Sequence, residues 1–122
     1  MTHGELPHNH GEKSVEVFQK LPQDNNFSAV ADVFDQLADK NRLKIFWILC
    51  HCEDCVINLS AMMKMSSPAI SHHLKILKIS GLIESRREGK EVYYKAADNS
   101  QAKMLHEAME LFMEIVCPIN ND

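Results

Sequence analysis

The sequence contains no long apolar run and none of the residue combinations that are typical of an enzyme. Its longest apolar run extends from Ile45 to Cys50, far short of the roughly 20 residues that cross a bilayer, and nothing in it resembles a signal peptide. There is no glycine-rich phosphate loop, no Ser/His/Asp arrangement and no catalytic carboxylate pair. We therefore expect a single-domain cytoplasmic protein of 122 residues that neither spans a membrane nor acts as an enzyme.

The chain also lacks an overall positive charge, because its formal net charge is −4. The balance reverses between residues 64 and 95, where seven Lys or Arg stand against three Glu, so that this segment carries +4 and the remainder −8. Such a split concentrates the attraction for DNA on one face and keeps the rest of the surface from binding phosphate indiscriminately. Nucleic acid is therefore a candidate partner for this segment.

Residues 66–80 have the pattern of an amphipathic helix with its own start and stop signals. Ser66 and Ser67 are N-cap candidates, and Pro68 follows at a first-turn position where its missing N–H is tolerated. Gly81 is typical of the residue that follows a helix. Apolar side chains at helical spacing can face a core, while Ser, His and Lys take the opposite side.

A basic β-hairpin is expected next, with strands at 82–87 and 92–95 around a turn that contains Gly89. A polar helix followed by a basic hairpin is the layout of a winged helix-turn-helix, in which the helix enters the major groove and the hairpin lies on the phosphates beside it. The predicted DNA-binding residues are Ser66, Ser67, Ser71, His72, His73, Lys75 and Lys78 of the helix and Arg86, Arg87 and Lys90 of the wing.

The whole chain is predicted to be mainly α with a small β-hairpin wing, in the order α-α-α-α-β-β-α. Residues 1–26 are interpreted as a flexible His-bearing N-terminal arm, 27–117 as the winged helix-turn-helix domain and 118–122 as a tail. The other helices are expected at 29–38 (capped by Ser28), 40–49, 56–63 and 99–116.

Two features of these helices carry expectations about packing. The helix at 40–49 should bury Leu43, Phe46, Trp47 and Leu49. The apolar stripe of the helix at 99–116 is longer than one small core can cover. We therefore expect this last helix to pack against its twin in a homodimer.

Three thiols and an imidazole lie within six residues, at Cys50, His51, Cys52 and Cys55. Thiols in the cytoplasm are reduced, so a metal or redox function is a better interpretation than a disulfide framework. Soft thiolates bind Zn, Cd, Pb, Cu(I) or three-coordinate As(III), and the imidazole favours Zn-like metals. Thiols that sense oxidants and thiols that are merely buried remain the alternatives.

Outside this cluster, His106 and Glu110 are four residues apart on one helical face. This pair can bind an ion, although we favour surface hydrogen bonding as its interpretation. Cys117 is a thiol without an assigned partner.

The chain resembles the ArsR/SmtB family of bacterial winged-helix repressors over about residues 28–116. The matching stretches are residues 34–45, Ser71-His72-His73-Leu74, residues 81–83 and residues 86–94. The resemblance implies a homodimer that binds an operator in double-stranded DNA and releases it when an inducer, commonly a metal ion, binds.

The resemblance extends only partly to the family's metal sites. Cys55 falls where family sensors place the first Cys of a Cys-x-Cys pair, but Ile57 occupies the second position. The family's four-ligand zinc site across the dimer corresponds to Asp98, Ser100, Leu111 and Glu114. Ser and Leu cannot serve as the expected ligands, so we expect that site to be absent.

Residues of the N-terminal arm complete the metal site in family members that use the Cys of the third helix. The arm of this chain offers His3, His8 and His10, which would turn a thiolate site into a mixed nitrogen and sulfur site. The alternative is a polar tail in which these histidines are incidental.

Together these observations predict a metal-responsive DNA-binding transcriptional repressor. It binds its operator as a homodimer and leaves it when a thiophilic ion such as Zn²⁺, Cd²⁺ or Pb²⁺ binds to Cys50, His51, Cys52, Cys55 and the arm histidines. A thiol-based redox-sensing regulator of the same fold is the alternative. A zinc-dependent interaction module that does not bind DNA is a further one.

Overall fold

The computed structural model describes residues 6–116, and the chain divides after Asp32 into two compact units. The first unit contains α1 (Glu12–Gln19) and most of α2 (Asp24–Gln36). Helix α1 lies within the segment that was predicted as a flexible arm. Helix α2 begins at Asp24, so the predicted cap at Ser28 was wrong. A carboxylate in the first turn of α2 is favourable because it faces the positive end of the helix dipole.

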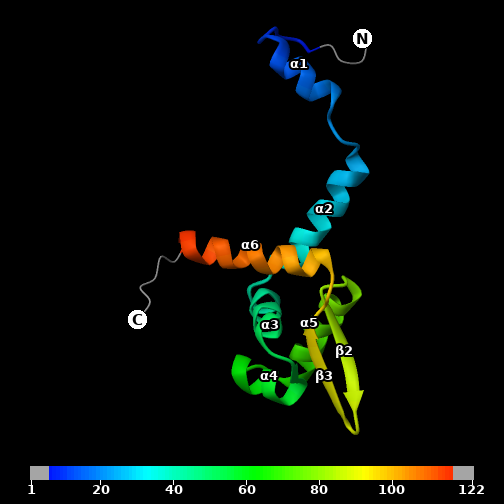
Figure 1. The fold of residues 1–122 in the computed structure, drawn as a ribbon, viewed down its shortest axis with the longest axis vertical. Coiled ribbons are helices and arrows are strands. Elements are labelled where there is room, and N and C mark those ends of the chain that lie inside the picture. The colour runs from blue at the N-terminus through cyan, green and yellow to red at the C-terminus, as the bar shows by residue number, and fades with distance from the viewer. Residues whose placement is uncertain (1–5, 117–122) are drawn as a thin grey trace. The chain divides into compact units, whose positions relative to one another are not determined.

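The second unit contains the elements that the sequence predicted, with one addition (Figure 1). Its order is α3 (Lys40–His51), β1 (Asp54–Cys55), α4 (Val56–Met63), α5 (Ser67–Ile79), β2 (Ile83–Glu88), β3 (Glu91–Ala96) and α6 (Ser100–Val116). The predicted mainly α, winged helix-turn-helix architecture is confirmed, and β1 is the element that was missed. Within residues 6–116, no helix has the length and apolar character needed to span a bilayer.

The core of the second unit draws apolar side chains from α3, α4, α5, β2 and α6. Its members are Ile45, Phe46, Leu49, Leu59, Ile70, Leu74, Leu77, Leu82, Ile83, Ala102 and Met109. Each large aliphatic or aromatic side chain that is fully buried stabilises the fold by about 1.5–3 kcal/mol. Trp47 was predicted to be buried, but it is 37% exposed, because Ile45, Phe46 and Leu49 occupy the inward face of α3.

Helix α5 begins and ends at the signals that the sequence provides. Its N-cap is Ser66, whose Oγ accepts a hydrogen bond from the backbone N–H of Ala69 at 3.2 Å. At the other end Gly81 has a φ of +78°, and the N–H of Leu82 donates to the carbonyl of Leu77 at 3.0 Å, as in a Schellman motif. Local hydrogen bonds therefore set both boundaries of α5.

The three strands form one antiparallel sheet in the order β1-β3-β2. Strands β2 and β3 make the wing, a hairpin that projects away from the helices in Figure 1. Glu88 pairs with Glu91, so the turn consists only of Gly89 and Lys90, and Gly89 takes the positive φ that such a tight turn requires. Cys55 of β1 pairs with Tyr93 on the other side of β3.

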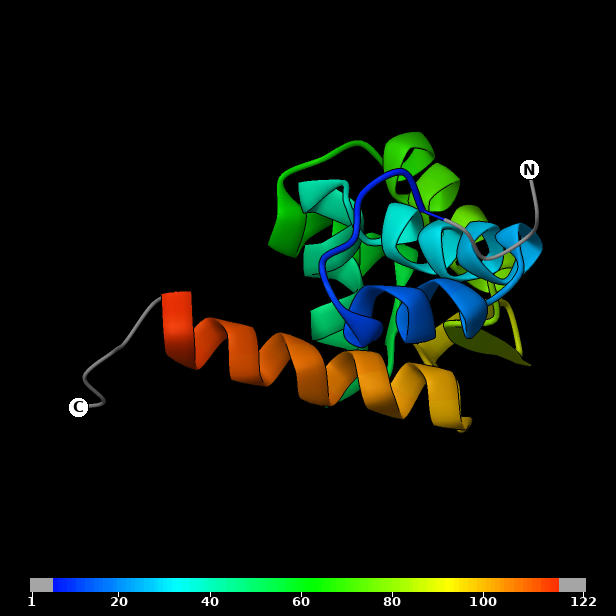
Figure 2. The ribbon, with the colours of Figure 1, turned by 90° about the horizontal axis from the view of Figure 1, so that it is seen from above.

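Helix α6 is anchored at its start and exposed toward its end. Asn99 accepts a hydrogen bond from the N–H of Ala102 at 2.8 Å and donates another to the carbonyl of Gly81 at 2.9 Å, which ties α6 to the end of α5. The C-terminal half of α6 extends beyond the other elements of the second unit (Figures 1 and 2).

This part of α6 leaves a large apolar surface uncovered within the described protomer. Leu111 is 59% exposed and Phe112 is 62% exposed, and Met104 and Met113 are exposed as well. An open apolar groove of about 320 Å³ lies between α6 and the side chains of Phe34, Leu37 and Leu43. Contiguous apolar surface of this kind is typical of a protein–protein interface.

Candidate functional site

The outward face of α5 is polar and unobstructed. Ile70, Leu74 and Leu77 hold the opposite face in the core, so the orientation of the outward face is fixed. Lys78 donates a hydrogen bond from Nζ to Ser85 Oγ at 2.7 Å and thereby links the end of α5 to the wing. The predicted DNA-binding residues that lie exposed on this helix are Ser67, Ser71, His72, Lys75 and Lys78, with Ser66 at the cap.

His73 departs from this arrangement, because it is only partly exposed and lies on the inward side of α5. Its Nδ1 is buried and finds no hydrogen-bond partner within residues 6–116. Burial lowers the pKa of His73, and the nearby Asp39 carboxylate opposes this shift. Successive helical residues point about 100° apart, so His72 faces solvent while His73 packs inward.

We expect His73 to make the folding stability depend on pH near neutrality. The unfolded chain binds a proton on this residue at its ordinary pKa of 6.5, whereas the folded chain resists protonation to a lower pH. The contribution of the neutral His73 ring to folding stability is therefore fully present above pH 6.5. It is lost as the pH falls toward the pKa of His73 in the folded chain. Denaturation midpoints measured between about pH 7.5 and about pH 5.5 should fall less in His73→Gln than in the wild type.

The exposed neighbour His72 supplies the matched control for that measurement. His72→Gln removes the same type of side chain from the solvated face. Its denaturation midpoint should change with pH as that of the wild type does. If the midpoint of His73→Gln depends on pH as strongly as that of the wild type, burial of this ring does not make folding stability depend on proton binding.

The three predicted wing cations are not equivalent. Arg86 donates from Nε and Nη2 to the carboxylate of Glu53 at 2.9 and 2.8 Å, and from Nη1 to Glu88 at 3.0 Å. These contacts lower the pKa of Glu53 and raise that of Arg86. Arg87 and Lys90 are exposed and form no ion pair with any residue in the described range. Arg86 is thus suited to hold the wing in place, and the other two cations to meet phosphate.

The predicted cysteine cluster is spread over three environments. Cys50 is half-buried in α3, Cys52 is exposed just after that helix, and Cys55 is buried in β1. Burial raises the pKa of the Cys50 thiol to about 11, with a smaller contribution from the charge of Glu110. Within residues 6–116 these thiols do not join His51 in a group of three whose ligand atoms lie within 4.8 Å of one another.

The segment that carries Cys52 and Cys55 is connected to both strands of the wing. Cys55 pairs with Tyr93 of β3 through the sheet, and Glu53 holds Arg86 of β2 through the ion pair. The sequence did not reveal either connection, since Glu53 and Arg86 are 33 residues apart. A displacement of this segment must therefore move the wing or break these contacts.

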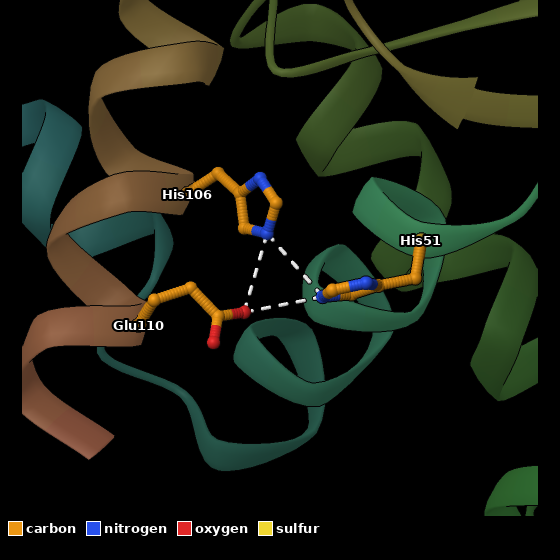
Figure 3. A group of neighbouring side chains, drawn as sticks. All are labelled: His51, His106 and Glu110. Atoms are coloured by element: carbon orange, nitrogen blue, oxygen red, sulfur yellow. Dashed lines mark hydrogen bonds and ion pairs between the residues drawn. The ribbon is translucent and has the colours of Figure 1, made fainter. Parts of the chain in front are cut away.

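His51 follows Cys50 at the end of α3, and its ring meets Glu110 of α6 (Figure 3). Its Nε2 is 3.1 Å from Glu110 Oε1, and the Nε2 of His106 is 3.2 Å from the same oxygen. Among the described residues, His51, His106 and Glu110 form the one group of three potential metal ligands whose atoms lie within 4.8 Å of one another. The spacing of His106 and Glu110 was visible in the sequence, but their third partner was not.

The remaining candidates lie in the N-terminal segment and the tail. The rings of His8 and His10 stack on one another with their centroids 5.9 Å apart. His3, Cys117 and the predicted tail at 118–122 lie outside the described residues.

A helix-turn-helix formed by α4 and α5, with a polar outward face and a basic hairpin after it, defines a winged helix-turn-helix DNA-binding protein. The family model described as bacterial regulatory protein, arsR family, matches residues 39–85. The chain is similar to the cadmium resistance transcriptional regulatory protein CadC homolog of Staphylococcus aureus, with 34% identity over 116 residues and 94% of each chain covered.

Two further relatives agree with that match. The transcriptional repressor SmtB homolog of Synechocystis sp. is 40% identical over 85 residues, which cover 70% of this chain and 64% of the relative's own length. A homodimeric winged helix-turn-helix DNA-binding domain from Mycobacterium bovis superposes with a TM-score of 0.68 at 28% identity, over 83% of this chain and 96% of the other. This chain belongs to the arsR family of bacterial regulatory proteins. It is a transcriptional regulator and not an enzyme.

Proposed function

We propose that this chain is a metal-responsive transcriptional repressor that binds operator DNA as a homodimer and leaves it when a thiophilic ion of the Zn²⁺, Cd²⁺ or Pb²⁺ type binds. The observation that carries the proposal is the rigidly oriented polar face of α5 beside the exposed wing cations. A bacterial regulator of this class works in the compartment that holds the chromosome, so we place it in the cytoplasm.

The DNA-reading part of the proposal assigns different tasks to α5 and to the wing. Ser71, His72 and Lys75 are exposed on α5, where they can reach base edges in the major groove. Arg87 and Lys90 lie on the wing and can neutralise phosphates without regard to sequence. Specificity would then come from α5, and most of the salt-dependent affinity from the cations around it.

The homodimer part of the proposal rests on the exposed apolar surface of α6. Helix-turn-helix dimers read two half-sites about 34 Å apart, so a pair of α5 helices must be held at a fixed separation. Joining two α6 helices through Leu111 and Phe112 would cover the apolar groove and set that separation. The Mycobacterium bovis domain of similar fold is itself homodimeric.

The effector part of the proposal places the metal on Cys52 and Cys55, with Cys50 or His51 and an arm histidine completing the site. Both thiols would bind the ion as thiolates, and the charge of the ion would offset theirs and that of the adjacent Glu53 and Asp54. Within residues 6–116 these thiols do not belong to a group of three potential ligands, so completing the site requires the 52–55 segment or a further ligand to move. The contacts of that segment with β2 and β3 would transmit the movement to the wing.

A mobility-shift titration on DNA from upstream of the protein's own gene tests this function. Reduced protein should bind that DNA far more tightly than a scrambled duplex of equal length, and the affinity should fall steeply with salt. Equal affinity for both duplexes would contradict operator recognition. Absence of any shift at low salt would support the alternative of an interaction module that does not bind DNA.

We expect the wing cations to differ in the same assay. Lys90→Gln should weaken binding to all sequences alike and lower the slope of log K against log salt by about one, because one phosphate contact is lost. Arg86→Gln should change the slope much less, because Glu53 and Glu88 already compensate its charge. Lys103→Gln on α6 is the control and should leave the slope unchanged. Equal slope changes for Lys90→Gln and Arg86→Gln would contradict this distinction.

A further inference from the structure

Three side chains from two helices converge at the end of α3. His51 comes from the last turn of α3, and His106 and Glu110 come from one face of α6 (Figure 3). The Nε2 atoms of the two histidines are 3.3 Å apart, and each lies 3.1 or 3.2 Å from Glu110 Oε1. The side chains of His51 and His106 are 44% and 31% exposed, so the group is open to solvent on one side.

Hydrogen bonding alone cannot satisfy this triangle. If both Nε2 atoms carry protons and donate to Glu110 Oε1, the 3.3 Å contact between the two nitrogens joins two donors. If one of them is unprotonated, it can accept from the other imidazole, but its lone pair then also faces the carboxylate oxygen, which is no donor. The same oxygen also accepts from Trp47 Nε1 at 3.0 Å. A cation bound by all three atoms, just above the plane of the triangle, would satisfy both nitrogen lone pairs and the carboxylate together.

We propose that His51, His106 and Glu110 form a divalent-cation site of the zinc type within one protomer. Ligands at about 2.0–2.1 Å in a tetrahedral zinc site are separated from one another by about 3.3 Å. The three separations in the structure are 3.1, 3.2 and 3.3 Å, so the spacing of these atoms matches that of ligands around zinc. This site contains no thiol and goes beyond the proposed function, because it requires neither DNA nor a cysteine. With His51 in this site, Cys50 is left to join Cys52 and Cys55 in the effector site.

The donor set defines the chemical class of the ion. Two imidazoles and one carboxylate suit Zn²⁺ and the related ions Co²⁺, Ni²⁺ and Cu²⁺, whereas Ca²⁺ and Mg²⁺ prefer oxygen ligands. Water can complete the coordination from the exposed side. Trp47 would orient two of the ligands without binding the ion itself. Its N–H donates to Glu110, and the centroid of its ring lies 4.2 Å from that of His51.

The position of the site gives it a consequence for the fold. His51 is the last residue of α3, and His106 and Glu110 lie on the helix that carries the exposed apolar surface. A metal ion would therefore join the end of α3 to α6. Because the ligands come from two helices that separate on unfolding, the ion should bind the folded chain and raise its melting temperature.

The only tryptophan of the chain provides a direct readout, since Trp47 contacts two of the proposed ligands. We would titrate reduced protein with Zn²⁺ and with Co²⁺, following Trp47 emission, the visible absorption of Co²⁺ and the melting temperature. His106→Gln should weaken the binding that Trp47 reports by more than about tenfold and reduce the rise in melting temperature, since only the thiol site remains to bind metal. Glu107→Gln, an exposed carboxylate on the same helix, is the matched control and should bind as the wild type does.

A Cys52→Ser/Cys55→Ser variant separates this site from the thiol site. It should retain the Trp47 response and show Co²⁺ absorption without a thiolate-to-metal band. If the response persists in His106→Gln but disappears in the cysteine variant, the ion binds to thiols and the inference is overturned. No response in the wild type at micromolar metal would also overturn it. Neither result depends on whether metal releases DNA, so failure here leaves the proposed repressor function standing.

Discussion

A Leu111→Glu/Phe112→Glu variant is expected to be monomeric and to lose at least about a thousandfold in operator affinity. Both side chains are large, apolar and more than half exposed on the C-terminal half of α6. In a symmetric dimer the two changes would place four carboxylates in one apolar interface, where unpaired charge is strongly unfavourable. A monomer offers one recognition helix to a two-half-site operator, so binding should fall toward the non-specific level.

Light scattering and DNA-binding anisotropy on the same samples check this prediction. Ile57→Glu is the matched control for oligomeric state, because Ile57 is 68% exposed on α4 and lies outside the proposed interface. Leu105 is a less suitable target: it is partly buried against the core, so a charge there would also test folding. A double variant that stays dimeric, or a monomer that binds the operator normally, would contradict the proposed interface.

The second large effect concerns the metal response. A Cys52→Ser/Cys55→Ser variant should bind DNA as the wild type does and should no longer release it when Zn²⁺, Cd²⁺ or Pb²⁺ is added. In the wild type we expect metal to lower the affinity for operator DNA more than a hundredfold. This corresponds to about 3 kcal/mol of coupling free energy between metal binding and DNA binding. Cys52 is exposed, so Cys52→Ser alone should remove most of the response without disturbing the core.

Cys55 requires a folding control, because it is buried and its backbone belongs to the sheet. The melting temperature of the double variant should be compared with that of Cys52→Ser before its metal response is interpreted. Cys117→Ser is the matched thiol control and should keep the full response. Release of DNA by metal in a folded double variant would place the effector site elsewhere, with His51, His106 and Glu110 as the next site to test.

The contacts around Glu53 explain how such a coupling can arise over a short distance. The 52–55 segment reaches β3 through the pairing of Cys55 with Tyr93 and β2 through the bidentate ion pair of Glu53 with Arg86. Pulling Cys52 and Cys55 toward one ion displaces Glu53 between them. The wing would then shift relative to α5, and the two halves of the DNA-binding surface would no longer match one duplex.

Local signals in the sequence were sufficient to predict the DNA-reading elements. The start of α5 at Ser66, its end at Gly81 and the tight turn at Gly89 each depend on residues within five positions of one another. Helical periodicity also placed the buried and exposed faces of α5 correctly, apart from His73. Its neighbour His72 lies on the solvated face, and a difference of one residue decides burial in a helix.

The features that escaped prediction depend on contacts between distant segments. Strand β1 is only two residues long and exists because β3 lies beside it. Arg86 was predicted to contact phosphate, and its ion pair with a carboxylate 33 residues away was not foreseen. His51 looked like a member of the cysteine cluster, yet it meets Glu110, which is 59 residues away. Single-sequence patterns carry no information on such pairings.

Release of the repressor by metal is tested most directly by a metal titration of reduced protein bound to labelled operator DNA, with ultraviolet absorption and DNA anisotropy recorded on the same samples. Cd²⁺ should produce a thiolate-to-metal absorption band that saturates together with the loss of DNA-bound anisotropy, and a chelator should reverse both. A band that develops fully while the DNA stays bound would contradict a metal-released repressor. Release by oxidants alone, without any metal band, would identify the thiols as a redox switch instead.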